Sequence, residues 1–365
     1  MAFTAKDVVA LREKTGVGMM DCKKALVETD GDMDKAIEFL REKGLASAAK
    51  KASRVAAEGS VAAYKDGKAG SLVEINCETD FVANGEPFKA LANKVAKTVV
   101  ETKPADLDAL LKSKISDGDN TVEEAVQEVF LALRENMKVR RFALIEGHVI
   151  TYIHMGGTVG VLVGFDTDDA TAAKPEFETM GKDVAMQIAA MNPEYLSKDD
   201  ISDEDLANLK KITIESALNK PESLPMPILT SLINEVIEGK KWSEDDINIY
   251  QGLDNKQRKN FTNFISKEAL EILAATAVSH KAEIVDNKIF SGLVDGRINK
   301  QIKEICLLEQ TFVKDDKMNV AQYISSVAKN LGSEIKISKY ARFAKGEGIE
   351  KKQENFAEEI ANMVK

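Results

Sequence analysis

Cysteine is scarce in this chain, and long apolar runs are missing from it. The 365 residues include only three cysteines, Cys22, Cys77 and Cys306. They are widely spaced and match neither a paired disulfide framework nor a zinc-binding pattern. No apolar run reaches the length of about 18 residues that spans a membrane, and residues 1–6 lack the features of a signal peptide. We therefore expect a cytoplasmic protein that does not contact a membrane.

The sequence motifs that bind nucleotides, catalytic metals or redox partners are also missing. There is no GxxxxGKS/T loop, no GxGxxG segment that opens a helix, no HExxH and no CxxC. A nucleotide site on the chain is therefore not expected. The sequence predicts no metal and no other cofactor.

Positive charge is in deficit. The chain has 50 Lys and Arg residues against 60 Asp and Glu residues, which gives a formal net charge of -10. Binding to a nucleic-acid backbone depends on contacts from Lys and Arg. A role as an RNA-binding accessory of the ribosome is disfavoured, and we expect no direct contact with nucleic acid.

The rest of the composition is that of a globular protein long enough for two or three domains. The first 45 residues predict three short helices, the first of them capped by Thr4. Met19 and Met20 lie beside two glycines at the start of the second helix. Thioethers at such a place serve either a partner surface or a gap in the core, and both interpretations stay open. Residues 43–56 read as a helical or semi-flexible connector.

The main body shows a weak internal duplication, which indicates an α+β fold. Residues 61–75 predict one β-hairpin and residues 149–165 predict another. Each hairpin is followed by a helix, at 88–100 and at 180–191. A further helix is predicted from Thr121 to about Met137, with Glu124 in capping-box position.

From about 198 to 300 the pattern is almost wholly helical, which indicates a helical projection inserted into the second half. The predicted segments are 202–219, 226–239, 243–251, 255–280 and 284–303. The chain then predicts a helix at 320–331, a strand at 335–343 and a final amphipathic helix at about 352–364.

The stretch from Leu72 to Val82 is the most informative part of the core. Alternating residues up to Asn76 predict a half-buried strand, and a helical pattern begins after Phe81. Asp80 and Phe81 would therefore lie on a strand-to-helix corner, where a rigid scaffold can direct side chains outward. The alternative is that Asp80 is the N-cap of the helix and Phe81 its first core residue.

A nucleophilic site is a further possibility, since Cys77 and His154 lie near the ends of the two hairpins. A Cys/His-dependent hydrolase is therefore the alternative function. No oxyanion hole or orienting third group accompanies the pair. His154 also lies at an expected hairpin tip, where a side chain is exposed.

Four stretches together resemble the translation elongation factor Ts family. They occur in the family's order, and the resemblance covers about 1–220 and 283–365, with 221–282 as a departure that lengthens the helical projection. The stretches are Leu11 to Leu26 (LREKTGVGMMDCKKAL), Glu74 to Ala83 (EINCETDFVA), Tyr152 to Val163 and Ala341 to Lys351.

The resemblance implies a fold of six segments. These are a small ubiquitin-associated-like three-helix module with its linker (1–55), a first core half (56–146), a second core half in two parts (147–197 and 308–345), a long helical or coiled-coil projection (198–307), and a C-terminal helical module (346–365).

The resemblance also implies a non-enzymatic function, guanine-nucleotide exchange on elongation factor Tu. Thr79, Asp80, Phe81 and Val82 would form a wedge beside the Mg²⁺ site of that GTPase. Further contacts to elongation factor Tu would come from Arg12, Met19, Met20, His154, Gly156, Phe356 and Ile360. A homodimer or a 2:2 complex with the GTPase stays open.

Overall fold

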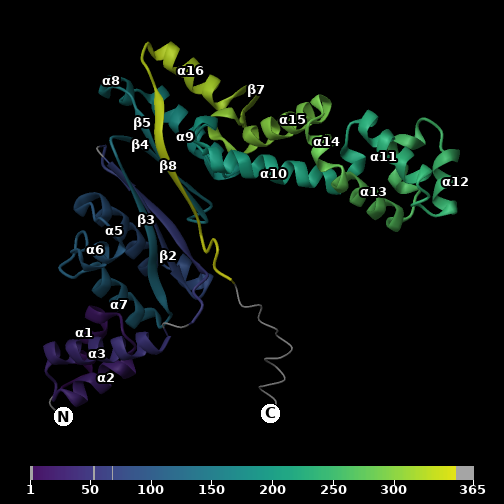
Figure 1. The fold of residues 1–365 in the computed structure, drawn as a ribbon. Coiled ribbons are helices and arrows are strands. Elements are labelled where there is room, and N and C mark those ends of the chain that lie inside the picture. The colour runs from purple at the N-terminus through teal and green to yellow at the C-terminus, as the bar shows by residue number, and fades with distance from the viewer. Residues whose placement is uncertain (1–2, 52–53, 68, 351–365) are drawn as a thin grey trace, which may run out of the picture. The chain divides into compact units, whose positions relative to one another are not determined.

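The structure, a computed structural model, describes residues 3–51, 54–67 and 69–350. They fall into two compact units. The first comprises Met1–Asn192 and Phe312–Lys365, and the second comprises Pro193–Thr311. Figure 1 shows the second unit in green, entered from the teal part of the chain and left toward the yellow part. The predicted final helix at 352–364 lies outside the described residues.

The N-terminal part of the first unit is a three-helix group, as predicted. Its helices are α1 (Ala5–Thr15), α2 (Met19–Glu28) and α3 (Met33–Lys51). Thr4 caps α1 and forms a capping box with Asp7. Leu11, Leu26 and Leu40 fill the core between the helices. The third helix ends at Lys51, so most of the expected connector 43–56 is helical. Likeness to a ubiquitin-associated module stays a prediction.

Two three-stranded antiparallel sheets form the centre of the first unit, in agreement with an α+β fold. The first sheet has the order β1-β2-β3 and the second the order β4-β5-β8. The strands are β1 (Glu58–Lys65), β2 (Ala69–Cys77), β3 (Met137–Glu146), β4 (His148–His154), β5 (Val159–Asp166) and β8 (Lys336–Ala344). Both predicted hairpins are present, and β3 is a strand that was not predicted from the sequence.

The two sheets share a local irregularity. In the first sheet Glu74 pairs with Arg141 and Ile75 with Val139, so Arg140 is an extra residue in β3. In the second sheet the same shift leaves Ser338 as the extra residue in β8. Each sheet therefore carries a β-bulge in its third strand, which supports the duplication expected from the sequence.

Helices cover the outer faces of both sheets (Figure 1). On the first sheet, α5 packs against β1 and β2 through Phe88 and Val95. On the second, α9 packs against β4 and β5. The helices of this unit after α3 are α4 (Asp80–Asn84), α5 (Glu86–Thr102), α6 (Leu107–Lys112), α7 (Val122–Leu133), α8 (Asp169–Ala172), α9 (Pro175–Met191) and α16 (Val320–Leu331). A short pair of strands, β6 (Thr311–Phe312) and β7 (Asp315–Asn319), precedes α16.

Strand β2 is the most enclosed element of the first unit. All nine of its residues are buried. Val73 and Ile75 belong to the core beneath α5, whereas Leu72 belongs to a cluster with Val149 and Leu162 of the second sheet. The prediction of a half-buried strand was therefore wrong, because α5 covers one face of β2 and the second sheet covers the other.

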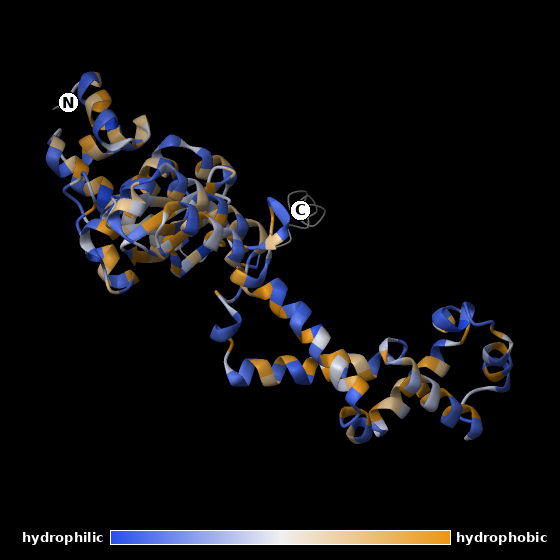
Figure 2. Ribbon diagram, turned by 90° about the horizontal axis from the view of Figure 1, so that it is seen from above, coloured by the Kyte–Doolittle hydropathy of each residue, from blue (hydrophilic) through white to orange (hydrophobic). Residues whose placement is uncertain are grey.

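The second unit is helical, as predicted. Its helices are α10 (Asp203–Asn219), α11 (Met226–Glu238), α12 (Glu244–Gly252), α13 (Lys267–Ser279), α14 (Lys281–Val285) and α15 (Lys288–Ile305). The predicted segments 255–280 and 284–303 are each divided, because Ser266 caps the start of α13 and Asn287 caps the start of α15. Along these helices apolar and polar residues are intermixed, as the orange and blue of Figure 2 show.

A hydrophobic core of its own holds the second unit together. Trp242 is buried in it and donates an indole hydrogen bond of 2.8 Å to the carbonyl oxygen of Ala269. Phe261 and Leu273 are buried in the same cluster. That residues 198–307 form a coiled coil stays a prediction.

The two ends of the second unit are joined to each other. The N–H of Tyr195 donates to the carbonyl of Ile305 at 3.1 Å, and the N–H of Leu307 donates to the carbonyl of Tyr195 at 2.9 Å. The N–H of Leu308 donates to the carbonyl of Leu196 at 3.0 Å. These bonds form a stem at residues 194–196 and 305–308. Among the described helices, none is both long and apolar enough to cross a membrane.

Candidate functional site: an exposed spur after strand β2

The corner after β2 is a short helix that begins three residues after the strand ends. Thr79 is the N-cap of α4, and its hydroxyl oxygen accepts a hydrogen bond of 3.3 Å from the N–H of Val82. Asp80 is the first helical residue. The alternative in which Asp80 is the cap is wrong, because Thr79 supplies the capping oxygen.

Phe81 points away from the protein, with 88% of its surface exposed. Asp80 beside it is exposed as well. The residue that enters the core is Ala83, which is 5% exposed, with Val82 packed partly against the same cluster. Positions two apart on a helix face in nearly opposite directions, so burial of Ala83 turns Phe81 outward. The alternative in which Phe81 is the first core residue is therefore wrong, and we call residues 79–82 the spur.

The base of the spur is clamped by a carboxylate from the loop between α7 and β3. The N–H of Thr79 donates to Oε2 of Glu135 at 2.9 Å, and the hydroxyl of Thr79 donates to Oε1 at 2.6 Å. One carboxylate thus takes both donors of a single residue, a charge-assisted arrangement that fixes orientation as well as distance. No pattern in the sequence pointed to Glu135.

The residues on either side of Glu135 are also held. Arg134 adopts a left-handed backbone conformation (φ 62°) that ends α7, and its guanidinium lies 2.8 Å from a carboxylate oxygen of Asp21 in α2. The N–H of Asn136 donates to Oε1 of Glu78 at 2.6 Å. Three consecutive residues therefore contact three separate segments, namely α2, the spur and the residue that precedes the spur.

The tip of the second hairpin presents His154, as the sequence predicted. His154 is exposed at the end of β4, and its Nδ1 lies 2.9 Å from the hydroxyl of Tyr152. Gly156 has a positive φ of 66° in the turn. Met155 between them is 77% exposed, although no sequence pattern pointed to it.

The N-terminal helices present the two methionines to solvent. Met19 is 40% exposed and Met20 is 66% exposed, and Arg12 of α1 is exposed as well. The core interpretation of the methionines is thereby disfavoured. Phe356 and Ile360 lie outside the described residues.

Cys77 is unsuited to a role as a nucleophile. Its side chain is fully buried, and its thiol donates to the carbonyl of Thr79 at 3.2 Å. Burial and, after it, the negative charge of Glu135 raise the pKa of the Cys77 thiol to about 12. A thiol with this pKa is almost entirely protonated at neutral pH, so the Cys/His hydrolase alternative is not supported. In the part of the chain that the structure describes, no group of three or more His, Cys, Asp and Glu residues is arranged to hold a metal ion.

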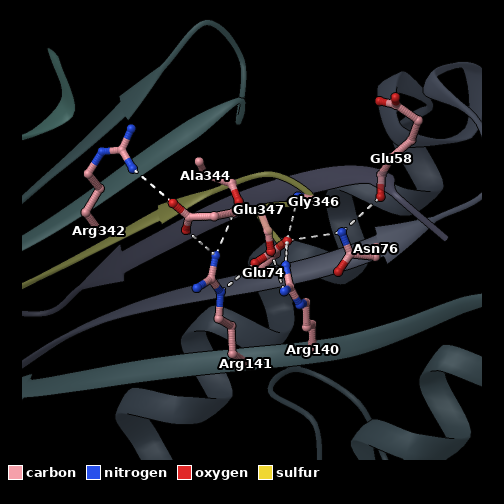
Figure 3. Close-up of polar contacts among 9 residues, drawn as sticks. All are labelled: Glu58, Glu74, Asn76, Arg140, Arg141, Arg342, Ala344, Gly346 and Glu347. Atoms are coloured by element: carbon pink, nitrogen blue, oxygen red, sulfur yellow. Dashed lines mark hydrogen bonds and ion pairs between the residues drawn. The ribbon is translucent and has the colours of Figure 1, made fainter. Parts of the chain in front are cut away.

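A second polar cluster, also missed from the sequence, lies on β2 just before the spur. The carboxylate of Glu74 is fully buried. It forms ion pairs with Nη1 of Arg140 at 3.0 Å and with Nε of Arg141 at 2.6 Å (Figure 3). The bulge at Arg140 lets two consecutive arginines reach one carboxylate, because two residues of β3 oppose one residue of β2. Glu347 binds Arg141 at 3.1 Å and so brings the turn after β8 into the same cluster.

Similarity to known proteins extends over nearly the whole chain. A model of the family described as Elongation factor TS matches residues 78–242 and 253–347. A curated Elongation factor Ts from Clostridium perfringens (strain ATCC 13124) is 44% identical, with 99% of each chain covered. One from Clostridium botulinum (strain Eklund 17B) is 41% identical with the same coverage. One from Clostridioides difficile (strain 630) is 40% identical, over 100% of this chain and 99% of the relative.

These matches also bear on residues 221–282, where the resemblance to the family departed. The family model continues through most of this segment and omits only 243–252. The clostridial relatives match at nearly full length, so they share a segment of this size. With the four stretches, the fold and these relatives in agreement, the chain belongs to the elongation factor Ts family of translation elongation factors.

Proposed function

We propose that this protein is a guanine-nucleotide exchange factor that binds elongation factor Tu in the cytoplasm and promotes the release of GDP. Membership of the elongation factor Ts family supports the partner. The observation that carries the mechanism is the spur, where an aromatic ring is 88% exposed at the position to which the resemblance assigns the wedge. An exposed ring on a clamped base is suited to enter an apolar seam of another protein.

The action of the spur follows from what holds a nucleotide on a GTPase. A phosphate-binding loop and Mg²⁺ hold the nucleotide, and the ion is one of the largest local charges. Insertion of Phe81 between the helices that position these ligands would displace them, with Asp80 beside the metal site. Burial of one Phe side chain contributes about 1.5–3 kcal/mol, which corresponds to a roughly ten- to hundredfold weakening of nucleotide binding. The rest of the interface must supply the remainder.

Other surfaces would complete that interface. Arg12, Met19 and Met20 would bind the nucleotide-binding domain of the GTPase, and His154 with Gly156 would press near the spur. The second core half would hold another domain of the GTPase. The C-terminal segment with Phe356 and Ile360 would pack on the nucleotide-binding domain.

The proposed factor makes and breaks no covalent bond. Coupling between two ligands of one protein is reciprocal, so a factor that weakens nucleotide binding is itself displaced by incoming nucleotide. The cellular ratio of GTP to GDP then sets the direction of exchange. The net charge of -10 favours a protein partner over a nucleic acid. A homodimer of the factor and a 2:2 complex with the GTPase both stay open.

The test is the release of mant-GDP from elongation factor Tu, measured by stopped flow with and without this protein. We expect strong acceleration by the natural chain and a large loss of it in a variant with Asp80→Ala and Phe81→Ala. Phe264→Ala is a matched control, because Phe264 is another exposed aromatic residue (42%) and lies in the second unit, where no contact with the GTPase is proposed. If the double variant released GDP as fast as the natural chain, the assigned role of the spur would be wrong.

A further inference from the structure

We propose that Glu135 is a positioning residue for Phe81, one that holds the spur in the orientation needed for nucleotide exchange. The inference rests on the proposed exchange function. It begins from the short helix that carries the ring. Helix α4 has five residues, from Asp80 to Asn84, and a helix of this length is not stable by itself in water. Its orientation must therefore come from contacts with the rest of the protein.

Packing holds α4 through two small side chains, Ala83 and, in part, Val82. Ala83 is its one buried residue, and a methyl group covers little area. Phe81, the largest side chain of α4, makes almost no contribution, since it is 88% exposed. The polar contacts at Thr79 therefore add a directional constraint on the angle at which α4 leaves β2.

Those contacts converge on Glu135. Its two oxygens accept the N–H and the hydroxyl of Thr79 at 2.9 and 2.6 Å. The same hydroxyl oxygen accepts from the N–H of Val82, the residue after Phe81. The carboxylate thus fixes the hydroxyl rotamer of Thr79 and, through it, the first turn of α4 on both sides of Phe81.

Glu135 can transmit this constraint because its own loop is anchored. Arg134 binds Asp21 on one side, and Asn136 is buried and bound to Glu78 on the other. The short loop is therefore a support between helix α2 and the end of β2. Glu135 binds Thr79, and in this proposal it acts through the orientation of residue 81.

The first measurement is the dependence of the GDP-release rate on the concentration of this protein. For Glu135→Ala we expect a fall of about tenfold in the maximal rate, because a bidentate charge-assisted contact is lost. The half-saturating concentration should change by less than about twofold, since the other docking surfaces are untouched. Glu135→Gln keeps one acceptor oxygen, so its maximal rate should lie between those of the natural chain and of Glu135→Ala. Glu123→Ala, at the other end of α7, is the matched control.

A double-mutant cycle tests whether the effect passes through Phe81. In a Phe81→Ala background, Glu135→Ala should cause no further loss, because the ring that it positions is gone. An equal tenfold loss in both backgrounds would overturn the inference, because Glu135 would then act independently of the spur.

A readout without the GTPase separates this inference from the proposed function. In a Phe81→Trp variant labelled with 5-fluorotryptophan, the protein gives two ¹⁹F resonances, one from the tryptophan introduced at position 81 and one from Trp242 in the second unit. Introduction of Glu135→Ala or Glu135→Gln should shift or broaden the resonance of position 81 and leave that of Trp242 unchanged. Hydrogen exchange at residues 79–84 should become faster by about tenfold.

The two ideas fail in different ways. If Phe81→Ala left exchange unchanged, the proposed role of the spur would be wrong, whereas the ¹⁹F spectra would still show whether Glu135 positions residue 81. If Phe81→Ala slowed exchange but neither Glu135 variant changed the rate or the resonance of position 81, only the positioning role would be wrong.

Discussion

The N–H of Gly346 donates a hydrogen bond of 2.8 Å to the carboxylate of Glu74, although 272 residues separate them in the sequence. The same buried carboxylate takes Arg140 and Arg141. Figure 3 shows Glu74 at the centre of these donors, with Asn76 beside it. The turn after the last strand of the second sheet is thereby fixed to the central strand of the first.

Replacement of Glu74 should therefore destabilise the fold. For Glu74→Ala we expect a loss of about 3–5 kcal/mol in the free energy of unfolding, because two arginines keep their charge and lose the buried partner. Urea denaturation at pH 7 measures it. Glu347→Gln is the control and should cost less than about 1 kcal/mol, since the side chain of Glu347 is 44% exposed. Equal losses in the two variants would contradict the central role of Glu74.

The same carboxylate predicts a dependence of stability on pH. Burial alone would raise the pKa of Glu74, but the N–H of Gly346 and the Arg141 guanidinium outweigh it and hold the pKa below the ordinary value of 4.5. A carboxyl with a lowered pKa in the folded state stabilises that state above the pKa of the unfolded chain. The contribution of Glu74 should be complete above about pH 5 and decline as the pH falls below 4.5. Denaturation of the natural chain and Glu74→Ala at pH 6, 5 and 4 should show the difference between them shrink at the lowest pH.

Two neighbouring glycines in the β4–β5 turn should respond differently to alanine. Gly157 has a φ of 105°, and a Cβ there would lie 1.9 Å from Oγ of Ser60. Gly156 has a φ of 66° and open space around it. We expect a loss of about 2–3 kcal/mol in unfolding free energy for Gly157→Ala and about 1 kcal/mol for Gly156→Ala. Ser60→Ala should recover part of the larger loss. Indistinguishable urea midpoints for the two glycine variants would show that the turn does not dock on Ser60 as described.

The three cysteine thiols should be protected from alkylation in the folded protein. All three are buried, and burial is the largest cause that raises the pKa of each thiol, to about 12 for Cys77 and about 11 for Cys306. Iodoacetamide at pH 8 should leave the native chain unmodified on a timescale that alkylates all three sites in urea, as mass spectrometry would show. Cys77→Ser should leave the rate of GDP release unchanged within about twofold, because a hydroxyl can keep the bond to the carbonyl of Thr79. A large loss of exchange in a stably folded Cys77→Ser variant would argue against the proposed mechanism.

Residues 221–282 should be dispensable for exchange. The proposed contacts with elongation factor Tu all lie in the first unit, whereas this segment lies in the second. Replacement of 221–282 by a short Gly/Ser linker leaves α10, α15 and the stem in place. We expect GDP release within about threefold of the natural chain. The circular dichroism spectrum of the shortened chain should show that its remaining helices are folded. If such a folded variant lost exchange activity, the second unit would take part in exchange.

Sequence patterns predicted the elements whose signals are local. The hairpins, the helix at 320–331 and the cap at Thr121 follow from turn residues and from the spacing of apolar residues. Strand β3 was missed for a physical reason. Its bulge at Arg140 shifts the alternation by one residue, and the charged pair Arg140 and Arg141 interrupts the apolar pattern.

The resemblance named the residues of the proposed site, but no sequence pattern pointed to the residues that support it. Phe81 could be named from the resemblance, but its exposure depends on the burial of Ala83, which a five-residue helix is too short to reveal by periodicity. Glu135 lies 56 residues from Thr79. Glu74 looked like the polar side of a half-buried strand because its arginine partners lie 66 and 67 residues further on. Contacts at such separations arise from the tertiary fold and leave no signal in a local window.

The stem at residues 194–196 and 305–308 has a consequence for how the core can vary. The stem brings the two ends of the second unit together. The effective length of the loop that connects β5 to β8 is therefore much shorter than the number of residues between these strands. The entropic cost of closing that connection then depends little on how many residues lie beyond the stem. Whole helices could be gained or lost there in related chains, while β5 and β8 keep the same register.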